Sequence, residues 1–241
     1  MFLPRAAIAF AVSCLPAAAQ VWDPVAEFSG DHGNPNGVWS YGWSPIGFGT
    51  FNPYTNFGDY GGTYQWWGWN GDHTPCIWHN RTNEVRNNIL PGELSLHPGP
   101  GTEPTVLRWI APEGVADAVR VRGVFGHGDI GGMTVAVRVN NVEVWSAINN
   151  GAFDLRVQTV AGTTIDFAVF DDYWYGNTPL AATIALACAP DFNNDDFLTF
   201  EDFDAFVAAF EAGDALADFN ADGFLTFEDF DAFVAEFEAG C

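Results

Sequence analysis

Two twelve-residue runs near the C-terminus carry oxygen-bearing side chains at fixed intervals. Both runs have Asp, Asn or Thr at positions 1, 3, 5, 9 and 12. Calcium prefers roughly six to eight hard oxygen ligands, and alternating side chains let one tight loop surround the ion while position 7 adds a backbone carbonyl. The spacing therefore predicts two calcium ions, one in loop 191–202 and one in loop 218–229. The expected ligands are Asp191, Asn193, Asp195, Phe197, Thr199 and Asp202 in the first loop, and Asp218, Asn220, Asp222, Phe224, Thr226 and Asp229 in the second.

The two loops belong to an internal duplication. Residues 191–213 and 218–240 are identical at 20 of 23 positions, at a spacing of 27. After each loop, apolar side chains recur at helical intervals. These residues are Phe203, Phe206, Val207 and Phe210 in the first copy and Phe230, Phe233, Val234 and Phe237 in the second. We therefore expect two loop-helix units, each with a short helix that begins at the end of the loop and stops at a glycine cap.

Position 6 of the loop differs between the copies. Gly223 suits the sharp turn that a calcium loop makes at this position. Asp196 stands there in the first copy, and Asp enters the left-handed region only at some cost. We therefore expect the first loop to bind calcium more weakly than the second, or to be less rigid.

The negative charge of the chain is concentrated in this repeat. The chain has 31 acidic residues and 8 basic ones, and residues 191–241 hold 15 of the acids and no base. Such a surface repels polyanions, which argues against a nucleic-acid partner. Because the acids repel each other and each helix is short, we expect calcium to supply much of the folding energy of the repeat. The alternative is an acidic amphipathic tail that binds no metal.

The tandem loops resemble a dockerin, whose calcium loops lack an entering helix and end in Asp, as at Asp202 and Asp229. The terminal pair Gly240-Cys241 is similar to that of the GC-type dockerin of domain-anchored proteins. The resemblance implies two calcium ions and docking onto a cohesin-like or other cell-envelope protein. It also implies a role for Cys241 in terminal processing or covalent anchoring, for which the alternative is an incidental thiol.

The resemblance has one departure, at loop positions 10 and 11. Phe-Glu stands at 200–201 and again at 227–228. Cellulosomal dockerins often have small hydroxyl residues there, in contact with cohesin. The departure argues against a cellulosomal cohesin as the partner.

Residues 20–189 show the alternation that is typical of β-strands. The alternating runs lie around 105–110, 119–125, 134–139, 142–145, 153–157 and 165–169. The pair Asn140-Asn141 between two of them predicts a tight hairpin, because Asn tolerates positive φ. Many short strands between Gly, Asn and Pro predict an all-β antiparallel sandwich or jelly roll. The small α-helical calcium-binding domain then follows at 190–241.

In amino-acid sequence, this β segment resembles a secreted β-sandwich domain of environmental bacteria. The matching stretches are 34–43, 97–99, 106–112 and 161–167. The resemblance implies the fold and no particular activity.

Aromatic residues crowd the first third of the β segment, among glycines and asparagines. Flat rings beside amide and carboxylate groups can stack on the faces of sugars, so Trp66, Trp67 and Trp69 are candidates for glycan binding. The alternative is that such rings form the core of the sandwich. The alternation of aromatic residues over 39–43 favours that alternative there.

Cys76 and Cys188 are the expected disulfide pair in an oxidising compartment. His73, Cys76 and His79 occur at intervals of three, a spacing that also suggests a zinc or copper site. However, Pro75 breaks a helix that would bring them to one face, and a strand would scatter them. Loop histidines beside a disulfide cysteine are therefore the favoured interpretation.

The sequence contains no signature of catalysis. It lacks a G-x-S-x-G nucleophile elbow, an H-E-x-x-H helix and a phosphate-binding glycine loop. The β segment has acids enough for a carboxylate pair that hydrolyses glycosides, but none stands out. They include Glu84, Glu93, Glu103, Glu113, Asp117, Asp129, Glu143 and Asp154. A secreted noncatalytic module is the favoured function, and a polysaccharide-active hydrolase carrying a dockerin is the alternative.

The N-terminus has the pattern of a secretory signal. Residues 1–19 contain Arg5, a short apolar stretch and a run of small residues at the end. That stretch is too short to cross a membrane, and no later one approaches about 20 apolar residues. The alternatives are a buried helix and lipidation at Cys14. We therefore expect a secreted protein, extracellular or cell-surface associated, with a sandwich at 20–189 and a dockerin-like domain at 190–241.

Overall fold

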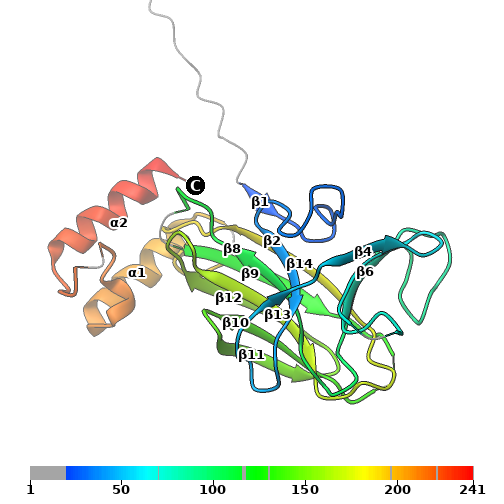
Figure 1. Ribbon diagram of the computed structural model, residues 1–241. Coiled ribbons are helices and arrows are strands. Elements are labelled where there is room, and N and C mark those ends of the chain that lie inside the picture. Colours follow the sequence, from blue (N-terminus) through cyan, green and yellow to red (C-terminus); the bar gives the residue numbers. More distant parts are fainter. Residues whose placement is uncertain are drawn as a thin grey trace, which may run out of the picture.

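The computed structural model describes residues 20–69, 71–115, 118–129, 131–195, 197–220 and 222–240. The expected signal segment 1–19 lies outside the described residues. A β-sheet region is followed by two helices, which lie beside one of its ends (Figure 1). In these ranges no helix is both long enough and apolar enough to cross a membrane.

The described strands form two antiparallel sheets that pack as a sandwich. The first sheet has eight strands, in the order β12 (Gly151–Gln158), β9 (Ala118–Phe125), β14 (Thr178–Leu186), β7 (Leu94–His97), β6 (Cys76–Asn80), β5 (Thr63–Trp67) and β4 (Asn56–Asp59), with β1 (Val21–Trp22) paired to β14. The second sheet has six strands, in the order β11 (Val142–Ile148), β10 (Thr134–Val139), β13 (Thr164–Phe170), β8 (Thr105–Ile110), β2 (Trp39–Trp43) and β3 (Asn52–Pro53). The predicted β-sandwich is confirmed.

The hydrophobic core lies between the two sheets. Period-two alternation gives each sheet an apolar face, and these two faces pack against each other. Fully buried side chains come from both sheets, among them Leu96 of β7, Val121 of β9, Leu107 of β8 and Phe167 of β13. Burying a side chain of this size stabilises the fold by roughly 1.5–3 kcal/mol. Trp39 and Tyr41 of β2 are also fully buried, so the aromatic alternation over 39–43 belongs to the core.

The predicted hairpin joins β10 to β11. Asn140 and Asn141 have φ values of 47° and 67°, the left-handed conformation that Asn tolerates best after glycine. The side chain of Asn140 accepts a hydrogen bond from the backbone N–H of Thr164 at 3.0 Å, which ties the turn to β13.

A buried ion pair joins β8 to β13 within the second sheet. Arg108 lies opposite Asp166 and donates two hydrogen bonds to its carboxylate, at 2.7 and 2.8 Å. Asp166 is buried, and the Arg108 guanidinium lies over the ring of Phe51, 4.3 Å from the centroid. The arginine therefore supplies the only charge compensation seen for this carboxylate among the described ion pairs.

The C-terminal repeat folds into α1 (Phe200–Ala212), a short 3-10 helix η1 (Ala215–Ala217) and α2 (Phe227–Ala239). Each α-helix starts with a capping box. In α1 the side chain of Thr199 accepts the N–H of Glu201, and the carboxylate of Asp202 accepts the N–H of Thr199. Gly213 ends α1 with φ 72°. The two predicted loop-helix units are confirmed.

Equivalent phenylalanines of the two copies pack on each other. Phe206 and Phe233 occupy the same position of the repeat, and their rings stack with centroids 4.1 Å apart. The contact between Phe200 and Phe237 recurs, with the copies exchanged, between Phe210 and Phe227. The same two repeat positions are thus in contact whichever copy supplies which residue. This reciprocity means that the two helices are related by approximate twofold symmetry. The duplication thus produces one shared core that neither copy could form alone.

We expect Arg108→Ala to lower the free energy of unfolding by about 3–5 kcal/mol, since it leaves Asp166 buried without a partner. Arg86→Ala is the matched control, because Arg86 pairs with exposed Glu84 at 3.7 Å and such pairs contribute less than about 1 kcal/mol. Urea unfolding followed by tryptophan fluorescence measures both. All ten tryptophans precede residue 190, so the signal reports on the sandwich. Equal losses in the two variants would contradict the prediction.

Candidate functional site

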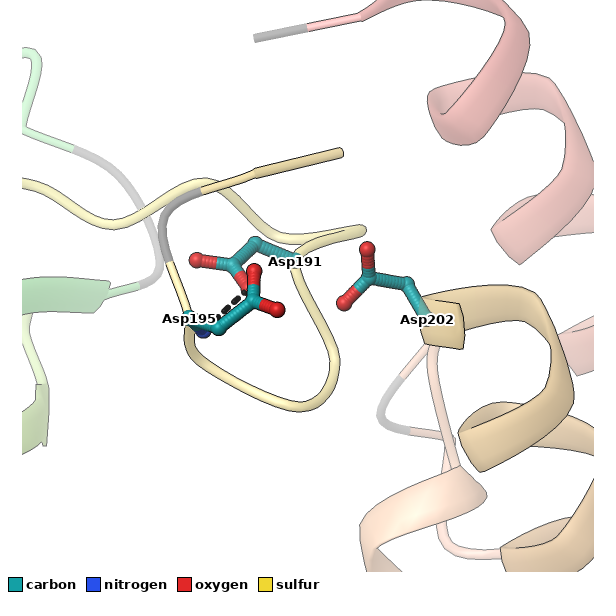
Figure 2. A group of neighbouring side chains, drawn as sticks. All are labelled: Asp191, Asp195 and Asp202. Atoms are coloured by element: carbon teal, nitrogen blue, oxygen red, sulfur yellow. Dashed lines mark hydrogen bonds between the residues drawn. The ribbon is translucent and has the colours of Figure 1, made fainter. Parts of the chain in front are cut away.

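The first loop of the repeat gathers three of its predicted ligands around one point. One carboxylate oxygen from each of Asp191, Asp195 and Asp202 lies within 4.8 Å of the others. Figure 2 shows the three side chains close together, with Asp191 and Asp195 on the loop and Asp202 at the start of α1. Like charges at this separation repel, so the group is suited to a bound cation.

Backbone N–H groups of the loop orient these carboxylates. Asp195 donates its N–H to Asp191 Oδ1 at 3.0 Å. Asn193 and Thr199 donate theirs to the two oxygens of Asp202, at 3.1 and 2.9 Å. Each carboxylate oxygen has two lone pairs, so a metal ion can still bind on the remaining ones.

The other predicted ligands of the first loop are placed less directly. The amide of Asn193 donates to Asp195 Oδ2 at 3.1 Å, which keeps it beside the carboxylate group. The hydroxyl of Thr199 caps α1, and the ring of Phe197 is exposed, so its expected contribution is its backbone carbonyl. Asp196, at position 6, lies outside the described residues.

The second loop repeats the hydrogen bonds of the first. Asp222 donates its N–H to Asp218 Oδ1 at 3.1 Å, and Asn220 donates to Asp229 Oδ1 at 3.2 Å. Gly223 has φ 86°, as the sharp turn at position 6 requires, and donates to Asp218 Oδ2 at 2.9 Å. Among the described residues, the first loop alone brings three carboxylates within 4.8 Å. Gly223 therefore lies in the second loop, whereas the tighter carboxylate group lies in the first loop.

Position 12 of the second loop is held in its ionised form. Asp229 is fully buried, yet hydrogen bonds from backbone N–H groups, that of Thr226 above all, hold its pKa below the ordinary value. A metal ligand must be deprotonated, so this environment favours calcium binding.

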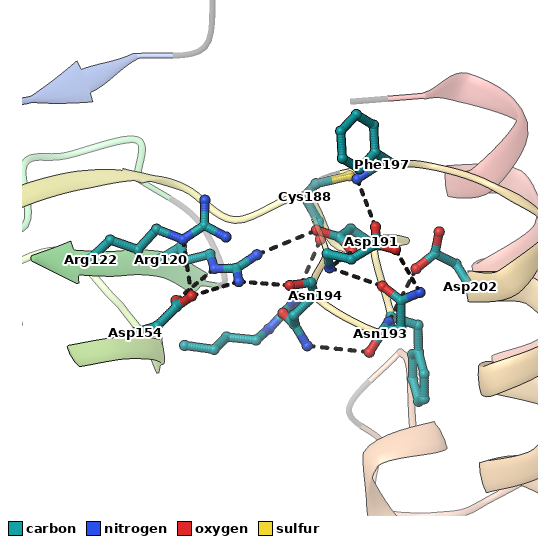
Figure 3. Close-up of polar contacts among 12 residues, drawn as sticks. Arg120, Arg122, Asp154, Cys188, Asp191, Asn193, Asn194, Phe197 and Asp202 are labelled. Atoms are coloured by element: carbon teal, nitrogen blue, oxygen red, sulfur yellow. Dashed lines mark hydrogen bonds and ion pairs between the residues drawn. The ribbon is translucent and has the colours of Figure 1, made fainter. Parts of the chain in front are cut away.

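The first loop contacts the sandwich through Arg120 of β9 (Figure 3). The guanidinium donates two hydrogen bonds to Asp154 of β12, at 2.8 and 2.9 Å. It also lies 3.6 Å from the Asp191 carboxylate and donates to the backbone carbonyl of Asn194 at 2.6 Å. Arg120 therefore joins the first sheet to position 1 of the first loop.

A second arginine lies beside it. Arg156 is directly opposite Arg120 across the β9–β12 pair, a placement in which like charges repel. Burial lowers the pKa of Arg156, and the nearby carboxylate of Asp191 partly restores it. The end of the sandwich thus presents two arginines to an acidic loop. No local pattern in the sequence could have identified this contact, because it joins residues about 70 positions apart, as the Arg120–Asn194 hydrogen bond shows.

The three tryptophans predicted for glycan binding lie in different environments. Trp66 is buried in the core and donates its indole N–H to a backbone carbonyl, so the prediction that it stacks on a ligand is wrong. Trp67 is half-buried and its ring stacks on His73, with centroids 4.7 Å apart. Trp69 is 51% exposed and packs edge-on against Trp43.

A cavity of about 250 Å³ lies over β5, β6 and β7. Directly opposed residues share a face of a sheet, and Gln65 pairs with Trp78 while Cys76 pairs with His97. The intervening Ile77 belongs to the core, so these four side chains are on the outer face of the first sheet. Hydroxyl and amide groups of the lining come from Thr63, Gln65, Thr74, Asn87, Tyr173 and Asn177. No pattern in the sequence indicates this site, because connecting loops create it by covering the strands.

The predicted disulfide between Cys76 and Cys188 is wrong. Cys76 is a free, buried thiol, and Cys188 is disulfide-bonded to a partner other than Cys76. Strand β6 places Cys76 at the cavity, whereas Cys188 follows β14 and lies next to the first loop of the repeat. Burial raises the pKa of Cys76 to about 12, so the thiol stays protonated. Cys241, predicted for anchoring, lies outside the described residues.

The histidines around Cys76 do not converge on it. Cys76 and His79 are three positions apart in β6, so they point to opposite faces of the strand. His73 stacks on Trp67 instead. Within the described ranges, the metal-compatible group is the carboxylate group of the first loop.

The acids considered for glycoside hydrolysis take part in local structural contacts. Glu143 lies 3.6 Å from Arg138, and Glu93 and Glu103 accept backbone N–H groups within their own turns. Asp117 lies outside the described residues. These contacts do not single out a catalytic pair.

The chain has distant structural likeness to solved carbohydrate-binding modules, and it matches no family model and no curated protein. It is similar to a family 35 carbohydrate-binding module from an environmental isolate, with 13% identity and a TM-score of 0.27 over 34% of this chain and 66% of that one. The family 35 module from Clostridium thermocellum is 11% identical, with a TM-score of 0.30 over 42% of this chain and 84% of that one. CBM35 from Paenibacillus barcinonensis is 12% identical, with a TM-score of 0.28 over 43% of this chain and 84% of that one. Likenesses at these TM-scores carry no argument about function.

We expect Arg120→Ala to loosen the first loop from the sandwich. Loss of a charged hydrogen-bond partner should raise amide exchange at Asn193 and Asp195 by about tenfold or more, with the second loop unchanged. Hydrogen exchange followed by mass spectrometry or NMR measures this. Arg86→Ala removes the same charge from an exposed site and is the control. Unchanged exchange in the first loop would show that Arg120 does not hold it.

Proposed function

We propose that the chain is a secreted, noncatalytic ligand-binding module that a calcium-folded repeat attaches to an extracellular or cell-surface partner. The observation that carries this proposal is the convergence of Asp191, Asp195 and Asp202 in a loop whose sequence is duplicated. Each copy of the loop takes one calcium ion.

The chemistry of the ligand set supports calcium as the cation. The side chains at the ligand positions offer carboxylate, amide and hydroxyl oxygens and neither His nor Cys, which is the donor set of a hard cation. The repeat contains no base of its own. The contact of Arg120 with Asp191 neutralises part of the first loop only. Bound calcium would therefore relieve a repulsion that the protein leaves largely uncompensated.

Removal of calcium should unfold the repeat and leave the sandwich folded, because the acids then repel each other without a counter-ion. We expect excess chelator to abolish amide-exchange protection in α1 and α2 while the protection of β13 is retained. Calorimetric titration of the calcium-free chain should give two binding sites. Unchanged protection of both helices in chelator would contradict the proposal.

Variants that remove the same charge at a predicted ligand position and at a non-ligand position distinguish the loss of a calcium ligand from a change in overall charge. Asp222→Asn changes a predicted ligand, and Asp231→Asn removes the same charge from the exposed side of α2. Loss of a ligand carboxylate should weaken one calcium site by about tenfold or more, whereas the α2 variant should change it by less than about twofold. Asp195→Asn and Asp204→Asn form the equivalent pair for the first copy. Equal effects within a pair would point to general screening instead of ligation.

The repeat also presents an apolar surface that supports docking. Phe197 and Phe200, and their counterparts Phe224 and Phe227, are each between 70% and 80% exposed. Large apolar side chains exposed at matching positions of both copies are characteristic of a protein interaction surface. Since acids surround them, the partner that fits best has an apolar patch with a basic rim.

Phe200→Ser combined with Phe227→Ser should abolish calcium-dependent attachment to the envelope fraction of the source cells. Both calcium sites should keep their affinity, because neither ring supplies a ligand. Co-sedimentation with and without chelator measures attachment. Val160→Ser, which changes an equally exposed apolar residue of the sandwich, is the control. Attachment that survives the double substitution would place the docking surface elsewhere.

A further inference from the structure

The cavity on the outer face of the first sheet lies apart from the calcium loops. It is lined by β5, β6 and β7 and by the connections that cover them. Strands β4 and β6 lie at the end of the sandwich away from α1 and α2 (Figure 1). Neither the calcium loops nor the exposed phenylalanines make use of this site.

The floor of the cavity is a prearranged hydrogen-bond network. Trp78 donates its indole N–H to Asn177 Oδ1 at 2.9 Å, and Asn177 donates its amide to Asp129 Oδ2 at 2.8 Å. Asn88 donates to the other oxygen of Asp129 at 3.2 Å. Because an indole can only donate, it fixes which way the Asn177 amide points. Asn177 is nine-tenths buried, so its orientation is set before any ligand arrives.

The loop that forms one wall, residues 171–177, is held tightly against a neighbouring connection. The N–H of Asp129 donates to the carbonyl of Asn177 at 2.8 Å, and the N–H of Gly131 donates to that of Tyr175 at 3.3 Å. A Cβ at Gly128 would come within 1.9 Å of the Asn177 carbonyl oxygen. This close approach requires glycine and positions Tyr173 at the cavity.

Two of the residues with left-handed backbone lie beside the same cavity. His73, between the lining residues Asp72 and Thr74, has φ 59°, and Tyr175, in the wall loop, has φ 58°. Bulky residues rarely adopt the left-handed region, and such conformations persist where the surrounding structure enforces them, often at binding sites.

The lining is polar and almost uncharged. Among the described lining residues there is no arginine or lysine. Burial lowers the pKa of His97, so the imidazole is neutral at neutral pH, and the thiol of Cys76 is protonated. Asp72, on the exposed side, is the one carboxylate among the described lining residues, and Asp129 lies behind Asn177. Such a site disfavours anions and offers donors and acceptors to a neutral, hydroxyl-rich molecule.

We propose that this cavity binds one ring of a neutral sugar. The volume, about 250 Å³, is below the roughly 300–1,000 Å³ of sites for drug-sized ligands, so it accommodates a single ring and not a longer chain. Tyr173, edge-on to His97 with centroids 5.4 Å apart, supplies an aromatic surface, and the amides of Gln65, Asn87 and Asn177 supply hydrogen bonds. The inference rests on the proposed ligand-binding function of the sandwich, and none of Trp66, Trp67 and Trp69 is among the described lining residues.

The test is NMR saturation transfer and calorimetry on the full chain with D-glucose, D-galactose, D-mannose and D-xylose, and with D-galacturonate as the anionic comparison. We expect at least one neutral sugar to bind more tightly than galacturonate. Tyr173→Ala should weaken that binding by about tenfold, since it removes the aromatic surface. Asn87→Gly should weaken it as well, without backbone strain, because Asn87 has φ 47° and is exposed. Trp69→Ala is the matched aromatic control and should leave the affinity within about twofold.

The inference is overturned if no neutral sugar binds, if galacturonate binds best, or if Trp69→Ala abolishes binding while Asn87→Gly and Tyr173→Ala retain it. Thermal unfolding of each variant separates a lost site from a lost fold, and Asn87→Gly keeps the test valid if Tyr173→Ala does not fold. Calcium titration and co-sedimentation are measured on the same preparations. Calcium-dependent attachment without sugar binding would overturn only this inference. Sugar binding without any response to calcium would overturn the proposed attachment and leave the cavity assignment intact.

Discussion

Repulsion among closely placed carboxylates governs the C-terminal repeat. The oxygens of Asp191, Asp195 and Asp202 lie within 4.8 Å of one another, in a segment without a single base. Backbone N–H groups offset part of this repulsion, and the proposed calcium ion offsets the rest. Asp202 closes the loop and also forms the capping box of α1. Loop closure and helix formation are therefore coupled, and the phenylalanine core between α1 and α2 depends on both.

The sandwich supplies positively charged side chains, which the repeat lacks. Arg120 and Arg156 lie opposite each other on β9 and β12, and the acidic first loop offsets their mutual repulsion. The described hydrogen bonds of Asp218 and Asp222, the predicted ligands of the second loop, stay within the repeat. Duplication therefore produced two loops that are nearly identical in sequence and different in environment. The first loop joins the repeat to the sandwich.

The two faces of the first sheet have different roles. The inner face packs against the second sheet through residues such as Ile77 and Leu96, whereas the outer face is covered by loops that leave a polar cavity. Strand β6, which lines this cavity, and the helices of the repeat lie at different ends of the sandwich (Figure 1). Under the proposed function, the module is attached at the end that carries the repeat, while the cavity near the other end stays accessible to a ligand.

Local patterns were enough to predict strands β8 to β13, the Asn140-Asn141 hairpin and the capped helices, because periodicity and turn preference depend on neighbouring residues. Alternation shows that Trp66 and Trp67 face opposite ways, but not which of them enters the core. The free thiol of Cys76, the Arg120 contact and the cavity floor at Asn177 were decided only by the tertiary structure. Each depends on segments far apart in the chain that come together when the sheets and their covering loops pack.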